Sequence, residues 1–439
     1  MKKTDSFDVV VIGGGVAGAV AALAAREAGK SAACIAQAPG ATALSSGAVD
    51  PLPETSPPGP LSHAERGDAP DTVPLSPRGG AVLSRVEGGT GDRGFLKDAL
   101  SFAREAFLSL GLTGGAGAGG ALVLPTVLGT WKKALLALST QAPADLLSLE
   151  GRRLVVARFA DVEAAGWRPG RELARQAADC FGVEIAAAQE IEIEFQALSR
   201  RMGAFETAAA IDADPSLAAM IGERIGRKVG NGAPSLVLVD PVLGIRDYAR
   251  ALREVEAAAG VSCAEMLPTV PSVPGRRWQN AIEAALANAG VRAIKARALG
   301  FKAAGHKVTS IGVSDGVTVN GTAFVLATGR FVGGGIRREA GFDEPLFDLP
   351  VVCAGTPNPD VPMGELVGRR ISDRHTAFSA GVRVDDAMRP IGREGGPVFE
   401  NLWAAGAVVG DRTVADGPSG MGNAILSGYL AGRAAAGLQ

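Results

Sequence analysis

A glycine motif near the start of the chain has the spacing of a phosphate-binding turn. Gly13, Gly15 and Gly18 form G-x-G-x-x-G between a β-branched run and an alanine-rich segment. Without a Cβ, these residues permit a tight turn, close approach of the backbone to a phosphate, and close packing of a helix on a strand. A helix that begins there also points unpaired N–H groups and a partial positive charge at the same place. The motif therefore predicts a bound dinucleotide or half of one, and a glycine turn without a ligand is the alternative. The contacting residues would be Gly13, Gly14, Gly15, Val16, Ala17 and Gly18.

Gln37 closes the second strand of the same βαβ pattern. Units of this kind normally carry an acidic residue there, which binds the hydroxyls of an adenosine ribose. An amide can make the same hydrogen bond, but more weakly than a carboxylate. Gln37 is therefore a further candidate ligand residue, and it favours a mononucleotide such as FMN while leaving FAD as the alternative.

Three distant segments resemble the strand ends and final helix of flavoproteins built on the two-dinucleotide-binding fold. They are "FVLATGR" (324–330), "NLWAAGAVVG" (401–410) and "SGMGNAILSGYLAGRAAA" (419–436). The resemblance implies that all three surround a flavin. It adds to the cofactor site Thr328, Gly329, Gly406, Ala407, Met421 and Gly422.

A short hydroxylated loop, "LSSGAVD" (44–50), follows the second strand. It is similar to a loop that lies against the flavin in relatives of succinate dehydrogenase. Ser45 and Ser46 can donate hydrogen bonds, and Gly47 allows close approach of the backbone. An ordinary Ser-Gly turn is the alternative interpretation.

Candidates for substrate chemistry are few, because the chain has only three histidines. His375 has Arg374 beside it, and Arg276 and Arg277 stand together before a helical pattern. Adjacent arginines can bind a phosphate or a carboxylate. A packing role for His375 and a solvated helix start at Arg276 and Arg277 are the competing interpretations.

Composition argues against several other classes of protein. The net charge of −2 gives no reason to expect nucleic acid as a partner. The four cysteines lie far apart in the sequence, so their spacing predicts no metal site. Cys34 lies in an apolar strand pattern, which predicts a buried and unreactive thiol. The uncharged stretch 106–131 is rich in glycine and contains a proline, which predicts a loop rather than a transmembrane segment. No apolar leader precedes the first strand, so we expect a cytoplasmic location.

The elements that must position these residues suggest an α/β protein with two domains. A chain of 439 residues is too long for one compact core. We predict a Rossmann-like flavin-binding domain from 1–50 and 300–439, a Pro/Gly-rich loop insertion at 51–92, and an inserted α/β cap or partner domain at 93–299. Helices are expected at 16–28, 171–181, 245–258 and 423–436, and strands at 8–13, 31–37, 154–159 and 235–240. Within 316–335, a turn at Asn320-Gly321 is expected between two strands.

These segments, in this order, resemble the B subunits of anaerobic glycerol-3-phosphate dehydrogenases, within the fumarate reductase and succinate dehydrogenase-like superfamily. The similarity runs through "FDVVVIGGGVAG", "SSGAVD", "LPTVLGTWKKA", "LPTVPSVPGRRWQN", "VLATGRFVGGGI", "GVRVDDAMRP" and "NLWAAGAVVG". It implies a flavoprotein, usually with FMN, beside a catalytic FAD subunit and an iron–sulfur subunit. Such a complex oxidises glycerol 3-phosphate to dihydroxyacetone phosphate and passes electrons to quinone at the inner face of the cytoplasmic membrane.

Two alternatives remain open from the sequence. One is a stand-alone FAD-dependent dehydrogenase or reductase of a small anionic substrate, with the arginines or His375 as binding groups. The other is a flavin-free subunit that keeps the fold for assembly. The insertion at 51–92 departs from the family pattern and also allows a paralogue that serves another oxidoreductase.

Overall fold

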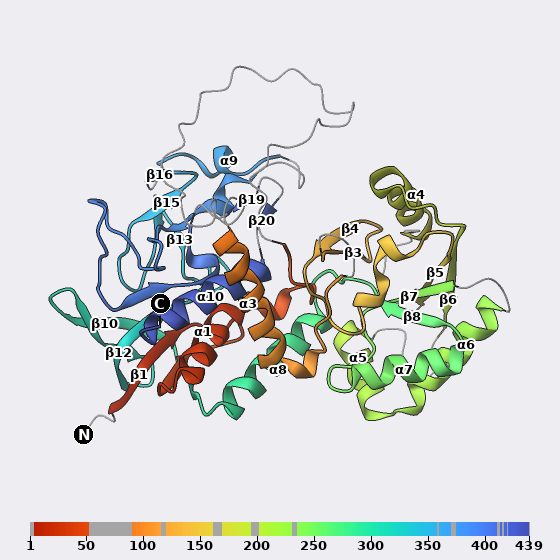
Figure 1. The fold of residues 1–439 in the computed structure, drawn as a ribbon, viewed down its shortest axis with the longest axis horizontal. Helices are drawn as coiled ribbons and strands as arrows, with labels where there is room; N and C mark the ends of the chain where they lie inside the picture. The colour runs from red at the N-terminus through yellow and green to blue at the C-terminus, as the bar shows by residue number, and fades with distance from the viewer. Residues whose placement is uncertain are drawn as a thin grey trace, which may run out of the picture. The chain divides into compact units, whose positions relative to one another are not determined.

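The computed structural model describes residues 4–51, 90–115, 120–160, 169–194, 202–230, 235–357, 360–369, 375–410, 413–414, 417–418 and 420–438. The chain forms two compact units (Figure 1). Unit 1 contains the chain up to Gly40, the helix α3 (Thr90–Ala106) and everything from Ala285 onward. Unit 2 contains Ala41–Pro51 and Phe107–Ala284.

Unit 1 is built on a seven-stranded sheet of order β10-β11-β12-β1-β2-β9, with β18 also paired to β12. Strand β1 is parallel to β12 and β2, and β18 is parallel to β12. The strands are β1 (Thr4–Ile12), β2 (Ala32–Ile35), β9 (Arg292–Ile294), β10 (Ala298–Ala304), β11 (Lys307–Val313), β12 (Thr318–Leu326) and β18 (Leu402–Ala404). Smaller elements of this unit are β13 (Arg337–Arg338), β14 (Phe342–Asp343), β15 (Val351–Cys353), β16 (Thr356–Pro357), α9 (Met363–Leu366), β17 (Gly381–Val382), β19 (Thr413–Val414) and β20 (Gly417–Pro418).

Two alanine- and glycine-rich helices, α1 (Val16–Glu27) and α10 (Met421–Ala435), pack closely against each other. A Cβ at Gly428 would lie 2.4 Å from the carbonyl oxygen of Ala17. One at Gly432 would lie 2.5 Å from that of Ala21. The backbones can approach this closely only because both positions are glycine.

The turn predicted at Asn320-Gly321 is wrong, because β12 continues through both residues. Asn320 pairs with Ser6 of β1 and Gly321 pairs with Phe7, so the long parallel ladder overrides the local turn preference. A Cβ at Gly321 would lie 2.8 Å from the side chain of Val10. The glycine therefore makes room for a neighbouring side chain rather than for a change of direction.

Unit 2 is a doubly wound domain whose four-stranded sheet is entirely parallel, in the order β6-β5-β7-β8. Its strands alternate between two hydrophobic cores, as the period of two requires. Leu154 and Val156 join the core that includes α4, whereas Val155 and Ala157 join the core that includes α6 and α7. The elements are β5 (Arg153–Phe159), α4 (Pro169–Phe181), β6 (Ala187–Ile193), α5 (Ala204–Ala213), α6 (Ser216–Val229), β7 (Ser235–Val239), α7 (Tyr248–Ala259) and β8 (Ser262–Glu265). The hairpin β3 (Leu122–Pro125) and β4 (Trp131–Ala134) and most of α8 (Val273–Asn288) belong to the same unit. Figure 1 shows α4 on one side of this sheet and α6 and α7 on the other.

The predicted fold class is confirmed, but the compact units have other boundaries than the domains predicted from the sequence. Helix α3 belongs to unit 1, where Phe102 packs on Tyr429 of α10 with ring centroids 5.3 Å apart. The segment 41–51 belongs to unit 2, where Val49 pairs with Leu136. Most of the predicted insertion at 51–92 lies outside the described residues.

Among the helices that the structure describes, none is both long enough and apolar enough to cross a membrane.

Candidate cofactor site

The glycine motif forms the turn between β1 and α1 in unit 1. Gly13 has a φ of +132°, and a Cβ there would lie 2.0 Å from the carbonyl oxygen of Ala327. A Cβ at Gly18 would lie 2.0 Å from the carbonyl oxygen of Gly13. The first and third glycines are therefore required by the packing of the turn itself.

The middle glycine stands at the start of α1. Gly15 is the N-cap residue of the helix, has an extended conformation and has no side chain with which to cap it. The first-turn N–H groups of a helix have no partner within the helix and are a ready site for an anion. No acidic residue lies in this first turn, so the helix supplies no carboxylate of its own to compete there.

The loop after β12 lies against this turn. The amide nitrogen of Thr328 is 3.1 Å from the position that a Cβ on Gly13 would take. The Thr328 hydroxyl is buried and has no hydrogen-bond partner among the described residues. Gly329 has a φ of +73°, and Gly335 folds back so closely that its Cβ would lie 2.3 Å from that hydroxyl. A buried hydroxyl without a partner usually marks a missing water, ion or ligand.

The segment after β18 lies between the start of α1 and helix α10. A Cβ on Gly406 would lie 2.7 Å from the Cβ of Ala17, and the Gly406 N–H donates to Ser427 Oγ at 2.8 Å. Ala407 is exposed, whereas Met421 and Gly422 are buried in the first turn of α10. Unit 1 thus brings together the glycine turn, the Thr328 loop and Gly406.

A buried cysteine of β2 contacts the backbone of the glycine turn. The thiol of Cys34 lies 3.5 Å from the carbonyl oxygen of Gly13. Burial raises the pKa of Cys34 to about 12, so the side chain stays a neutral thiol rather than a nucleophile. This agrees with the inert role that its apolar strand predicts.

The residue that follows β2 directly is Ala36, and Gln37 lies one position further along. Ala36 Cβ is 2.8 Å from where a Cβ on Gly14 would lie, so a methyl group faces the glycine turn. Gln37 is exposed. The side chain at the end of this strand is therefore neither acidic nor an amide.

The loop Ser45–Gly47 belongs to unit 2, where three buried side chains hold it. Ser272 Oγ donates to the carbonyl oxygen of Ser45, and Trp278 Nε1 donates to that of Gly47 at 2.8 Å. Gln141 Nε2 donates to the carbonyl oxygen of Ser46 at 2.9 Å. Sequence reasoning did not single out Gln141 or Ser272, although Ser272 lies within the "LPTVPSVPGRRWQN" segment, because each acts on residues about a hundred or more positions away.

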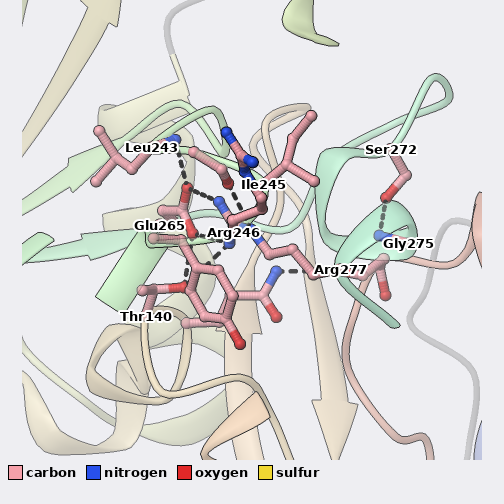
Figure 2. Close-up of polar contacts among 12 residues, drawn as sticks. Thr140, Leu243, Ile245, Arg246, Glu265, Ser272, Gly275 and Arg277 are labelled. Carbon is pink, nitrogen blue, oxygen red and sulfur yellow. Dashed lines mark hydrogen bonds and ion pairs between the residues drawn. The ribbon is translucent and has the colours of Figure 1, made fainter. Parts of the chain in front are cut away.

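The two adjacent arginines of α8 lie in different surroundings. Arg276 is exposed, with its guanidinium 5.8 Å from the ring centroid of Phe205. Arg277 is buried and forms a bidentate ion pair with Glu265, with N–O distances of 2.5 and 2.9 Å (Figure 2). Both side chains are fully inaccessible to solvent. The carboxylate that Arg277 binds is therefore one from its own unit.

The other donors around this ion pair are also used. Glu265 accepts hydrogen bonds from the Thr140 hydroxyl at 2.6 Å and from the Leu243 N–H at 2.9 Å. Arg277 Nε donates to the Gly244 carbonyl at 2.8 Å, and its guanidinium lies 4.2 Å from the ring centroid of Tyr248. These contacts favour a structural role over substrate binding.

His375 precedes a short 3₁₀ helix (Thr376–Ser379) in unit 1, and its Nδ1 accepts from the Gly368 N–H at 3.2 Å. Its ring also contacts Phe378 edge-on, with centroids 5.9 Å apart. Arg374 lies outside the described residues. Catalytic roles for these residues stay predictions. No group of His, Cys, Asp and Glu with the spacing of a metal site occurs in the described part of the chain.

The model of the FAD binding domain family matches residues 8–415. The chain belongs to the FAD binding domain family. A flavin is therefore its cofactor, and the helix start at Gly15, the glycine turn and the buried Thr328 hydroxyl fit such a group. The family match does not distinguish FMN from FAD.

Two curated relatives have names that match the family resemblance noted in the sequence. The chain is 34% identical over 211 residues to the B subunit of a probable anaerobic glycerol-3-phosphate dehydrogenase from Halobacterium salinarum, a match that covers 47% of this chain and 46% of that protein. The match thus spans about half the length of that relative. The chain is 26% identical over 424 residues to the B subunit of the anaerobic glycerol-3-phosphate dehydrogenase from Actinobacillus succinogenes, covering 92% and 93% of the two chains.

Among solved structures, a 3-ketosteroid Δ1-dehydrogenase from Sterolibacterium denitrificans matches 99% of this chain and 100% of its own, at 11% identity with a TM-score of 0.42. A flavocytochrome c3 fumarate reductase matches 99% of this chain and 78% of its own, at 11% identity with a TM-score of 0.37. Similarities as distant as these say nothing about function.

Proposed function

We propose that this chain is the flavin-containing electron-transfer subunit of an anaerobic glycerol-3-phosphate:quinone dehydrogenase complex. In that complex it would work beside a catalytic FAD subunit and an iron–sulfur subunit, peripheral to the inner face of the cytoplasmic membrane. The names of the relatives in Halobacterium salinarum and Actinobacillus succinogenes support this assignment.

The observation that carries the proposal is the convergence of two distant segments on the glycine motif of unit 1. Gly13 lies against Ala327, and Ala17 lies against Gly406. A bound flavin supplies the one- and two-electron redox chemistry that amino-acid side chains lack. The protein's part is to hold the phosphate at the start of α1 and to offer the Thr328 hydroxyl as a hydrogen-bond partner. The candidates for direct substrate chemistry are weaker, because Arg277 is already paired with Glu265.

We also propose FMN as the bound flavin. Ala36 presents a methyl group toward the glycine turn, at the position where an adenosine ribose would need a carboxylate. FMN has no such ribose, so nothing is missing from its binding site. Gln37 contributes little under this proposal because it is exposed.

The decisive experiment is gentle purification of the chain, first alone and then together with its co-expressed partner subunits. Absorption spectra and chromatography of the acid-released flavin show whether a flavin is present and which one it is. We expect FMN with the chain alone, and oxidation of glycerol 3-phosphate only when the other subunits are present. Turnover of a substrate by the chain alone with an artificial acceptor would instead support a stand-alone enzyme. A colourless chain that takes up no added flavin would support the assembly role.

A further inference from the structure

Gly40 is the last residue of unit 1 before the chain continues into unit 2. Its φ is not positive, so the backbone conformation there does not call for a glycine. The space around it does. A Cβ on Gly40 would lie 2.9 Å from Gly15 Cα and 3.1 Å from the Gly15 amide nitrogen. The contact that excludes a side chain at position 40 is therefore with the start of α1.

The nitrogen that a side chain at position 40 would meet belongs to the N-cap residue of α1. Among the described residues, the Gly15 N–H has no hydrogen-bond acceptor. N–H groups at the start of a helix bind phosphates because they lack partners within the helix and carry a partial positive charge. A methyl group on Gly40 would thus stand in contact with a group on which we propose that the flavin phosphate binds.

The whole segment 36–40 runs along the glycine turn. A Cβ on Gly14 would lie 2.8 Å from Ala36 Cβ and 3.7 Å from the carbonyl oxygen of Ala38. Together with Gly40 beside Gly15, these contacts involve only backbone atoms and one methyl group. The segment therefore brings no charged or hydrogen-bonding side chain to this part of the turn, and it acts on a ligand through the space that it leaves.

We propose that Gly40 makes the site selective for a phosphorylated flavin, because its missing side chain leaves the space beside the Gly15 N–H to the phosphate. The inference rests on the flavin binding proposed above and concerns unit 1 alone. Gly40 lies outside the G-x-G-x-x-G motif and is a specificity-determining residue of that same site.

The experiment compares FMN with riboflavin, which has the same ring and ribityl chain but no phosphate. The full-length chain, freed of flavin, is titrated with each, and binding is followed by flavin fluorescence. The wild-type chain should bind FMN at least about tenfold more tightly, because hydrogen bonds to a charged group are the stronger ones. In Gly40→Ala, the two affinities should lie within about twofold of each other, with riboflavin binding unchanged. If the chain releases FAD, FAD takes the place of FMN, since both carry this phosphate.

Gly300→Ala is the matched control. Gly300 lies in β10 of the same unit, its φ is not positive, and a Cβ there would meet nothing within 4 Å. This variant should keep the wild-type preference for FMN. A second measurement needs no variant: in the chain labelled with ¹⁵N-glycine, the amide signals of Gly15 and Gly40 should differ between the FMN and riboflavin complexes, whereas that of Gly300 should not.

The outcomes separate this inference from the proposed function. Equal affinity of the wild-type chain for both ligands would overturn the role of Gly40, and so would an equal loss of both affinities in Gly40→Ala, which describes a glycine needed only for packing. If Gly40→Ala does not fold, the amide signals decide, and identical Gly40 signals in the two complexes would refute the inference. A chain that binds no flavin at all would instead refute the proposed function.

Discussion

Replacing Arg277 tests whether it supports the fold or binds a substrate. The change Arg277→Met removes the cation from Glu265, which is 0% exposed. An uncompensated buried charge typically costs about 3–5 kcal/mol of stability. Loss of the guanidinium from the ring of Tyr248 adds to this cost, because a desolvated cation–π contact contributes up to about 2 kcal/mol.

For a unit the size of unit 2, each kcal/mol lowers the melting temperature by about 2–4 °C, so 3–5 kcal/mol gives a decrease of roughly 6–20 °C. Differential scanning calorimetry and urea unfolding followed by circular dichroism measure this directly. The matched control is Arg276→Met, which alters an exposed neighbour and should change stability by no more than about 0.5 kcal/mol.

A double variant separates charge burial from lost packing. In Arg277→Met with Glu265→Gln, the site is neutral, yet the new amide oxygen can still accept from the Leu243 N–H. We expect at least half of the lost stability to return, because no unpaired charge remains buried. The Gly244 carbonyl still lacks its donor, so recovery should be incomplete. The reasoning is refuted if Arg277→Met melts within about 2 °C of the wild type but abolishes binding of an anionic substrate, since that result describes a binding residue and not a structural one.

Three other predictions follow from single positions. Gly432→Ala should destabilise unit 1 by about 1–3 kcal/mol through overpacking of α10 on α1, measured by urea unfolding, whereas Gly364→Ala, where a Cβ meets nothing within 4 Å, should not. Burial raises the pKa of Asp240 to about 6, so its contribution to stability is complete at acid pH and is lost as the pH rises from the ordinary value of 3.8 through about 6. Asp240→Asn should flatten that pH dependence in unfolding curves, and an unchanged slope would show that another group causes it. Ala36→Glu should raise retention of FAD relative to FMN, as measured by chromatography of released flavin, while Gln37→Glu should change it little because that side chain is exposed. A strong effect of Gln37→Glu on the native flavin would count against FMN.

Local patterns were sufficient for the elements whose determinants lie within a few residues of one another. The β-branched strand, the glycine turn and the alanine-rich helix at Val16–Glu27 follow from the first stretch of the chain. Their chemistry also predicts an anion site at the start of this helix, because helix N–H groups and glycines act through the backbone. The fold class and the flavin follow from the same patterns together with the motifs at Thr328 and Gly406.

Local patterns failed where distant partners decide the outcome. The Asn320-Gly321 pair has the composition of a turn, but pairing with Ser6 and Phe7 draws it into β12. Likewise, the two arginines of α8 look equivalent in the sequence. Burial separates them, because Arg277 meets a carboxylate at the end of β8 while Arg276 stays in solvent.

The sequence by itself determined a glycine turn between a buried strand and a helix, and it predicted the flavin that the family match supports. Only the tertiary structure decided which polar side chains are already satisfied and which are not. Thr140 lies 125 residues from Glu265 and donates to its carboxylate, whereas the side-chain oxygen of Gln141, the next residue, has no hydrogen-bond partner among the described residues. Two adjacent residues therefore differ in whether their side chains are fully hydrogen-bonded. The difference depends on which residues are neighbours in space, so the local sequence does not predict it.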